Sequence, residues 1–229
     1  MAQYMYMFSR TTCKSTRQQT QCNPINFGII AAISQNNIIG INGTLPWRIP
    51  EDFRYFQDIT RDKVVILGRR TFGENLWMHA RHSIVISSSM NADDDEIDLA
   101  RTTIARTLND GLDIARTICV GSDWKHVADA LHVDNDDEHE HEQDSKAIHA
   151  WVIGGENIFL EALQHPAVNE LRLTKVGFDV DTRYVHDVHV RRFPPVSVWG
   201  NDFEQVGMWD GQDSCDARQY SFHVYRRLS

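Results

Sequence analysis

The stretch Leu-Pro-Trp-Arg-Ile-Pro-Glu-Asp-Phe-Arg-Tyr-Phe-Gln-Asp-Ile-Thr, residues 45–60, tells most about the fold and the site. A helix is predicted from Pro50, because proline suits a first helical position and the two acids after it suit the positive end of the helix dipole. Spacing of i, i+3, i+4 and i+7 then places four side chains on one face: Asp52, Tyr55, Phe56 and Ile59. A carboxylate on an aromatic, core-facing stripe is unfavourable without a partner. Asp52 therefore either faces water at the helix start or is satisfied by a protein cation or a polar ligand.

Trp47 favours the ligand interpretation. It stands between Pro46 and Pro50 in a rigid extended connection, which can hold its ring beside the carboxylate. A buried acid among aromatic rings suits a flat aromatic ligand with an amidine-like edge, because the carboxylate can accept two N–H bonds while the rings stack.

Short apolar runs alternate with helical patterns along the chain. Strands are predicted at residues 27–33, 63–67, 83–87, 117–120, 150–153 and 170–174, and helices at 50–60, 70–75, 123–132 and 156–163. This alternation predicts an α/β fold with a mainly parallel central sheet of about eight strands and helices on both faces. Residues 203–208 and 219–225 are predicted to close the chain as a C-terminal antiparallel hairpin.

One domain is predicted over residues 27–229, because 229 residues with 41% hydrophobic side chains can build a single core. Polar stretches near 90–111, 133–146 and 183–192 are predicted to be insertions. Residues 1–26 contain no Asp or Glu and are predicted to be a disordered extension, with a targeting segment as the alternative. The expected location is the cytoplasm, with a mitochondrion or another organelle as the alternative.

The charge of the chain limits its partners. A net charge of −9 argues against nucleic acid as the primary partner. However, 12 of the 32 acids lie in two runs, 93–98 and 134–144, so an anionic cofactor is not excluded. No apolar run reaches the roughly 20 residues of a transmembrane helix, so no membrane partner is expected. The alternating Glu and His of the second run lack a rigid scaffold, so no metal site is predicted.

Three strand ends carry features of a phosphate site. Gly68-Arg69-Arg70-Thr71 follows a strand and opens a helix, where backbone N–H groups and arginines can face an anion; solvated arginines on a plain turn are the alternative. Gly154-Gly155 either lets the backbone approach a ligand closely or makes an ordinary tight turn. Ser87 and Ser88 end a third strand, and ligands gather outside the carboxyl ends of parallel strands.

In this order the motifs resemble the dihydrofolate reductase family over residues 27–226. The matching segments are Ile29-Ile30-Ala31-Ala32, Ile38-Ile39-Gly40, Leu45-Pro46-Trp47, Pro50-x-Asp52-x-x-x-Phe56, Gly68-Arg69-x-Thr71-Phe72, Ile153-Gly154-Gly155 and Leu173-Thr174. The resemblance implies an oxidoreductase that reduces 7,8-dihydrofolate to 5,6,7,8-tetrahydrofolate with NADPH, in one-carbon and thymidylate metabolism. In that reaction a hydride passes to pterin C6 and N5 gains a proton.

The resemblance also implies a role for each matching residue. Asp52 would bind the N3 and 2-amino edge of the pterin and Thr174 would orient it, while Leu45 and Trp47 would belong to the loop that closes over the nicotinamide. Further substrate contacts would come from Ile30, Ala32, Phe53, Phe56 and Arg81, which aligns with the arginine that binds the substrate's tail carboxylate. Cofactor contacts would come from Ala32, Ile39, Gly68, Arg69, Arg70, Thr71, Ser87, Ser88, Gly154, Gly155, Glu156, Asn157, Ile158 and Phe159. The family joins the two glycines by a cis peptide.

The chain departs from the family pattern in places, and other interpretations remain. His79-Ala80 replace the Pro-Gly that usually precedes the tail-binding arginine, and Glu156 puts an acid near the pyrophosphate. The alternatives are a reductase of the riboflavin-pathway type, which lacks the Asp-x-x-x-Phe stripe, and a non-catalytic pterin- or nucleotide-binding module. A monomer is expected unless the chain is fused to or associated with thymidylate synthase.

Overall fold

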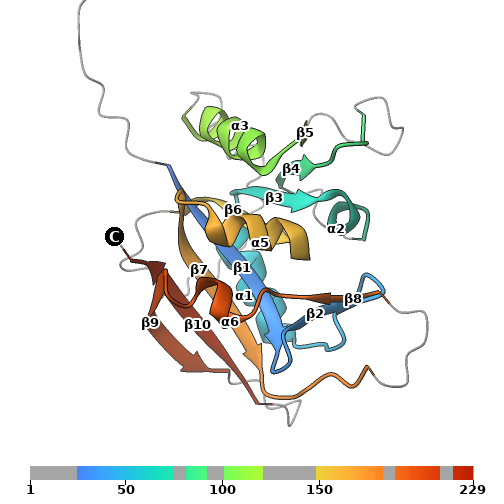
Figure 1. Cartoon of the computed structure of the whole chain (residues 1–229), viewed down its shortest axis with the longest axis vertical. Coiled ribbons are helices and arrows are strands. Elements are labelled where there is room, and N and C mark those ends of the chain that lie inside the picture. Colours follow the sequence, from blue (N-terminus) through green and yellow to red (C-terminus); the bar gives the residue numbers. More distant parts are fainter. Residues whose placement is uncertain are drawn as a thin grey trace, which may run out of the picture.

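The computed structural model describes residues 25–74, 81–91, 101–120, 148–182, 189–211 and 219–228. They form an eight-stranded twisted sheet with helices on both faces, in the strand order β5-β4-β3-β6-β1-β7-β10-β9 (Figure 1). The strands are β1 (Asn26–Ser34), β3 (Val64–Gly68), β4 (His82–Ile86), β5 (Thr102–Ala105), β6 (Ile148–Gly154), β7 (Val168–Val176), β9 (Phe203–Asp210) and β10 (Tyr220–Arg227). The predicted α/β fold is confirmed.

The direction of the strands brings their carboxyl ends together. Six neighbouring strands, from β5 to β7, pair in parallel, whereas β10 pairs antiparallel with both β7 and β9. The predicted C-terminal hairpin is therefore confirmed. A second, two-stranded sheet joins β2 (Ile38–Ile41) to β8 (Val190–Arg192). Because the six parallel strands end at one edge, the turns that follow them can build a common site.

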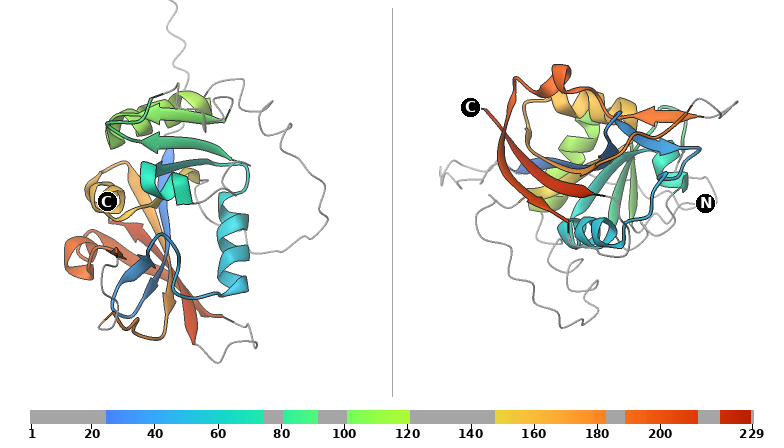
Figure 2. Two further views of the ribbon diagram at one scale, coloured as in Figure 1. Left: turned by 90° about the vertical axis from the view of Figure 1, so that its right-hand side faces the viewer. Right: turned by 90° about the horizontal axis from the view of Figure 1, so that it is seen from below.

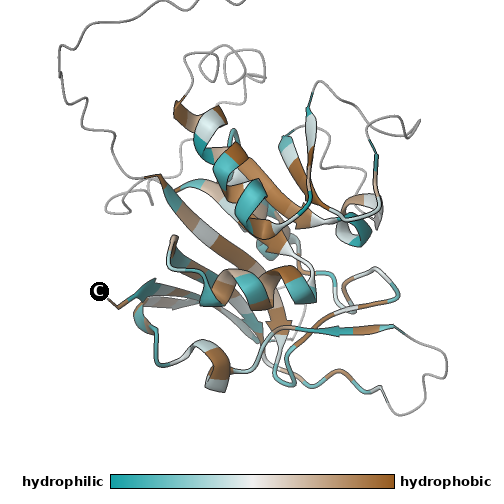
Figure 3. Ribbon diagram, turned by 45° about the horizontal axis from the view of Figure 1, so that its top comes forward, coloured by the Kyte–Doolittle hydropathy of each residue, from teal (hydrophilic) through white to brown (hydrophobic). Residues whose placement is uncertain are grey.

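The helices bury the sheet on both sides. Helices α1 (Pro50–Thr60) and α2 (Arg69–Glu74) cover one face, while α3 (Leu108–Val120), α5 (Glu156–Gln164) and α6 (Val196–Trp199) cover the other (Figure 2). The central strands are apolar on both faces, as their near-continuous hydrophobic runs predicted, and they form the brown centre of Figure 3. On the α1 face, the ring of Trp151 fills the space above Gly28, where a methyl group would lie 2.4 Å from it.

Two sequence predictions were wrong. Residues 117–120, predicted as a strand, form the last turn of α3, because Leu108, Gly111, Leu112 and Ala115 bury one helical face and carry the helix through this run. The stretch 90–111, predicted as an insertion, contains β5 and the start of α3. The Thr107 backbone N–H and hydroxyl both donate to the Asp110 carboxylate, at 3.1 and 2.8 Å, which stabilises the helix start inside a polar run.

Several other predictions fall wholly or partly outside the described residues. These include the extension before residue 25, the helix at 123–132 and the insertion at 133–146. Of the stretch 183–192, only 189–192 is described, and it contains β8. None of the described helices has the length and apolar character needed to cross a membrane.

Candidate active site

Asp52 lies on the buried face of α1, with 8% of its surface exposed. The Thr174 hydroxyl donates a hydrogen bond to its carboxylate, which is the contact that the family resemblance implies. Thr174 lies on β7, between Ala32 of β1 and Phe222 of β10. Burial raises the pKa of Asp52 from 3.8 to about 6, and the hydrogen bond from Thr174 limits that rise. The helix therefore holds a carboxylate that the protein satisfies only in part.

Trp47 adds an unused donor beside this helix. Its side chain is 7% exposed and packs edge-on against Phe178, with ring centroids 6.1 Å apart. The indole Nε1 is buried and has no hydrogen-bond partner among the described residues. Leu45, on the same connection into α1, is 48% exposed. A buried donor without a partner is one that a polar ligand or a water can satisfy.

The residues predicted to contact the substrate ring lie along α1 and β1. Ile30 is buried, Ala32 is half-buried, and the half-buried Phe56 packs against the cluster formed by Ile30 and Trp151. Phe53 is 44% exposed, and its contact with the substrate stays a prediction. Ile30 and Phe56 thus belong to one apolar cluster, and their contact with a substrate ring stays a prediction.

Arg81 lies at the far end of α1. Its Nε donates to the Thr60 carbonyl at 3.1 Å and its Nη2 donates to the Gln57 carbonyl at 3.2 Å. The guanidinium also lies 5.8 Å from the ring centroid of Phe56, and burial lowers its pKa. Arg81 thus caps the last turn of α1, and its binding of a substrate carboxylate stays a prediction.

The glycine pair of β6 meets the end of β3. Gly154 and Gly155 are joined by a cis peptide bond, and Gly154 has a φ of 130°, a conformation that favours glycine. A methyl group on Gly155 would lie 3.1 Å from the Thr71 hydroxyl, and one on Gly68 would lie 3.7 Å from the Gly155 nitrogen. Gly154 needs glycine for its φ and Gly155 for its close approach to Thr71, so the strand ends form a cradle of main chain and hydroxyl groups. Such a cradle fits the phosphate groups of a dinucleotide.

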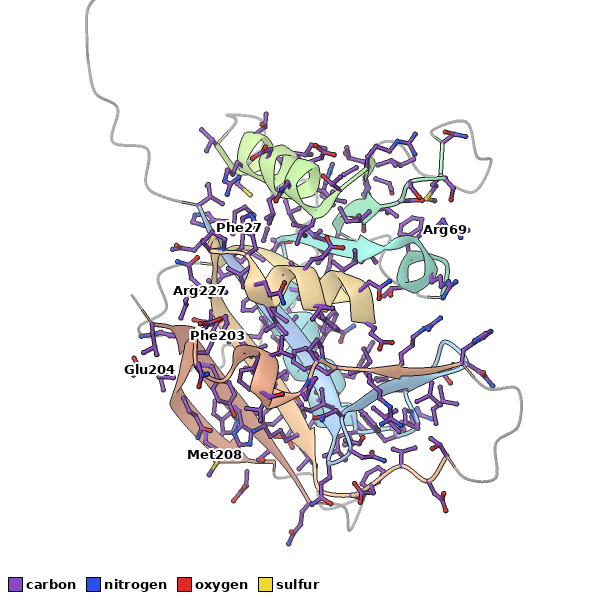
Figure 4. All side chains as sticks on the ribbon, viewed as in Figure 1. Phe27, Arg69, Phe203, Glu204, Met208 and Arg227 are labelled. Atoms are coloured by element: carbon purple, nitrogen blue, oxygen red, sulfur yellow. The ribbon has the colours of Figure 1, made fainter. Side chains whose placement is uncertain are left out.

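Basic side chains line the same edge. Arg69 and Arg70 are exposed at the start of α2, and Figure 4 shows Arg69 on the opposite side of the molecule from Met208 of the hairpin. Ser88 is exposed after β4. The Ser87 hydroxyl accepts the Met90 backbone N–H at 3.0 Å, so it shapes the turn. The donor set at this edge fits an anion.

Arg106 lies at the same edge of the sheet and was not among the predicted site residues. It follows β5, and its Nη1 donates to the carbonyls of Ser87 and Met90 at 3.1 and 2.9 Å. Sequence reasoning missed it because β5 fell inside the stretch interpreted as an insertion. The short run of β-branched residues at 102–104, two residues before Arg106, was the available signal.

The remaining predicted cofactor residues divide between surface and core. Asn157 is exposed, while Glu156 and Ile39 are half-buried. Ile158 and Phe159 face the sheet, and the Phe159 ring would lie 3.4 Å from a methyl group on Gly154. The Phe159 ring therefore packs against the backbone of the glycine pair, and its contact with a cofactor stays a prediction.

Comparison with known proteins agrees with this geometry. A family model described as dihydrofolate reductase matches residues 26–121. The chain is 30% identical to the dihydrofolate reductase of Neisseria gonorrhoeae over 156 residues, which cover 67% of this chain and 74% of that protein. The chain belongs to the dihydrofolate reductase family. It is an oxidoreductase of that family.

Other relatives extend the match along the chain. The dihydrofolate reductase of Drosophila melanogaster is 28% identical over 171 residues, covering 69% of this chain and 78% of that protein. That of Heliothis virescens is 27% identical over 216 residues, covering 89% and 98%. The family has a nicotinamide cofactor in general.

Proposed function

We propose that this chain reduces 7,8-dihydrofolate to 5,6,7,8-tetrahydrofolate with NADPH, and so supports one-carbon and thymidylate metabolism. The observation that carries the proposal is Asp52, a buried carboxylate held by Thr174 on an aromatic helix face. With a pKa of about 6, Asp52 is mostly ionised at neutral pH. It can then accept two N–H bonds from the N3 and 2-amino edge of a pterin.

The protein's part in the reaction follows from these positions. Asp52 orients the pterin and favours the tautomer in which N5 can take a proton, which comes from water. Ile30 and Phe56 form an apolar wall against the ring, and the free Nε1 of Trp47 can donate to a polar atom of the ligand or to a bridging water. Leu45 and Trp47 belong to a connection that can exclude bulk water by closing. Bound NADPH supplies the hydride.

The carboxyl edge of the sheet supports NADPH as the proposed cofactor. Gly154, Gly155 and Thr71 would hold the pyrophosphate, and Arg69, Arg70, Ser88 and Arg106 would surround the 2′-phosphate. Guanidinium groups bind phosphate through several charge-assisted hydrogen bonds, which favours NADPH over NADH. Arg69→Ala is expected to weaken NADPH by about tenfold or more and NADH far less, measured by fluorescence titration. An equal loss for both cofactors would move the 2′-phosphate contact elsewhere.

The decisive experiment follows the near-ultraviolet absorbance of NADPH after mixing with dihydrofolate, with and without an antifolate. Wild type is expected to turn over and the antifolate to stop it. Asp52→Asn is expected to lose about 100-fold or more in turnover at neutral pH while still binding NADPH, in the range seen for positioned acid–base groups. Asp58→Asn, an exposed acid on the same helix, is the matched control and should stay active. Wild-type turnover in Asp52→Asn contradicts the proposal.

A further inference from the structure

Two consecutive residues in the first turn of α1 each accept a hydrogen bond from a hydroxyl group of the sheet. Thr174 of β7 donates to Asp52, and Tyr220 of β10 donates to Glu51. The two strands are neighbours in the sheet, and Thr174 pairs with Phe222, two residues after Tyr220. Both views of Figure 2 show α1 lying beside β10. The first turn of α1 is therefore tied to the sheet at two points, and Asp52 is one of them.

The start of α1 has no cap of its own. The N-cap residue is Ile49, whose side chain forms no capping hydrogen bond, and Pro50 opens the helix. Most helices gain a local hydrogen bond at this point from a Ser, Thr, Asp or Asn side chain. Because α1 lacks one, the place of its first turn depends more strongly on contacts with distant segments.

Tyr220 is well fixed in the fold. Its side chain is 5% exposed, and its carbonyl accepts the Gly211 backbone N–H at 2.9 Å. Its ring lies so close to Gly211 that a methyl group there would be 1.9 Å from it, and it packs edge-on against Phe222 with centroids 5.8 Å apart. A hydroxyl on such a ring has little freedom, so it can define where its partner Glu51 lies.

The other contacts between this end of α1 and β10 are apolar. Tyr55 packs on Phe222 with ring centroids 4.5 Å apart, and Trp47 and Ile49 belong to the same buried cluster as Tyr220. Apolar contacts have no preferred direction, whereas a hydrogen bond fixes both a distance and an angle. The hydroxyl of Tyr220 thus adds a directional constraint that its ring alone does not give.

We propose that Tyr220 is a positioning residue: by holding Glu51, its hydroxyl sets the first turn of α1 on the sheet so that Asp52 meets Thr174. Tyr220 acts through geometry, because Tyr220→Phe keeps the ring and removes no charge at neutral pH. The link to catalysis rests on the proposed function, whereas the effect on the contact between Asp52 and Thr174 does not.

The test is a carbon-13 NMR titration of aspartate carboxyl groups in the ligand-free protein, with Asp52 assigned by the signal that Asp52→Asn loses. The hydrogen bond from Thr174 lowers the pKa of Asp52, so loosening it in Tyr220→Phe should raise the midpoint. A typical net hydrogen-bond contribution corresponds to about 0.4–1 pH unit. The rise in Tyr220→Phe should not exceed the rise in Thr174→Val, which loses the bond altogether.

A double variant separates geometry from a direct electrostatic effect. With Thr174→Val already present there is no bond left to loosen, so adding Tyr220→Phe should change the midpoint by less than about 0.3 pH units. The charged or titratable groups that act on Tyr55 in this part of α1 are Asp52 and, on β7, Glu170 and Arg172. All of them, and Glu51, remain in the variants.

Tyr225→Phe is the matched control. Tyr225 is also a buried tyrosine of β10, but its hydroxyl accepts a hydrogen bond from Lys175 at 2.7 Å instead of binding α1. The Asp52 midpoint should therefore change by less than about 0.3 pH units in this variant.

A raised midpoint in Tyr220→Phe that disappears in the Thr174→Val background supports the proposal. A midpoint that moves no more than in Tyr225→Phe, or a rise that persists without the Thr174 hydroxyl, overturns it. The titration needs no substrate, so it stands apart from the turnover assay. If the chain reduces dihydrofolate, Tyr220→Phe should also lower turnover by about three- to tenfold while leaving the Kd for NADPH unchanged, because only the pterin side is misplaced.

Discussion

Asp52→Asn is expected to stabilise the ligand-free protein at neutral pH. The pKa of Asp52 is raised from 3.8 to about 6 in the folded chain, a difference of about 2. Each unit corresponds to about 1.4 kcal/mol, so ionised Asp52 costs the folded state about 3 kcal/mol above pH 6. An asparagine carries no charge to bury, and its amide can still bond to Thr174. The expected gain is about 2–3 kcal/mol at pH 7.5.

The sign of the pH dependence follows from the same shift. Between about pH 4 and pH 6 the folded state binds a proton at Asp52 that the unfolded chain has already lost, so the stability of wild type rises as the pH falls through this window. The stability of the asparagine variant has no such dependence on pH from residue 52. The variant should therefore be more stable than wild type by the full amount at pH 7.5, and this difference should largely disappear at pH 4.

Urea unfolding of the ligand-free proteins, followed by tryptophan fluorescence at several pH values, measures this difference. Comparing two proteins at each pH cancels the other titrating groups, such as His223, whose pKa burial lowers to about 4. Asp58→Asn is the control, since Asp58 is exposed in a surface pair with Arg61 and should change the stability by less than about 1 kcal/mol. A stability difference between wild type and Asp52→Asn that stays constant from pH 4 to pH 7.5 would refute the reasoning.

Three further predictions concern the site and its support. Thr174→Val removes the hydroxyl that lowers the pKa of Asp52, so the pH profile of turnover should shift to higher pH. An unchanged profile would show that Thr174 does not influence the titration of Asp52. Dihydrofolate should raise the melting temperature of wild type more than that of Asp52→Asn, because its donors satisfy the carboxylate, and equal increases would contradict this. Gly28→Ala should lower the free energy of unfolding by about 1–3 kcal/mol, because its methyl group overlaps the Trp151 ring. Gly73→Ala, with open space around it, is the control for overpacking and should not destabilise.

The sequence predicted the elements whose patterns are local. Helix α1 was predicted with both ends correct, because Pro50 and the acids mark its start and the stripe from Asp52 to Ile59 fixes its buried face. The central strands and the closing hairpin followed from apolar runs separated by turn residues. Helix α3 was missed because its C-terminal residues favour strands, and only packing of its Gly111 face against Ile84 and Ile86 selects the helix.

The residues of the candidate site also fall into those that local sequence patterns predict and those that only packing reveals. The sequence supplied Asp52, Trp47, Arg69 and the glycine pair, since each belongs to a short motif with its own chemical meaning. It could not supply Arg106, which became visible only when β5 paired with β4 and brought it beside Ser87.

By itself, the sequence determined the order of the elements, the faces that they bury and the carboxylate that stands out on one of them. The tertiary structure alone decided the environment of that carboxylate: burial raises its pKa, and the hydroxyl from β7 limits the rise. The reason is physical. Periodicity and turn chemistry act between near neighbours, whereas burial and electrostatic fields depend on which distant segments pack together.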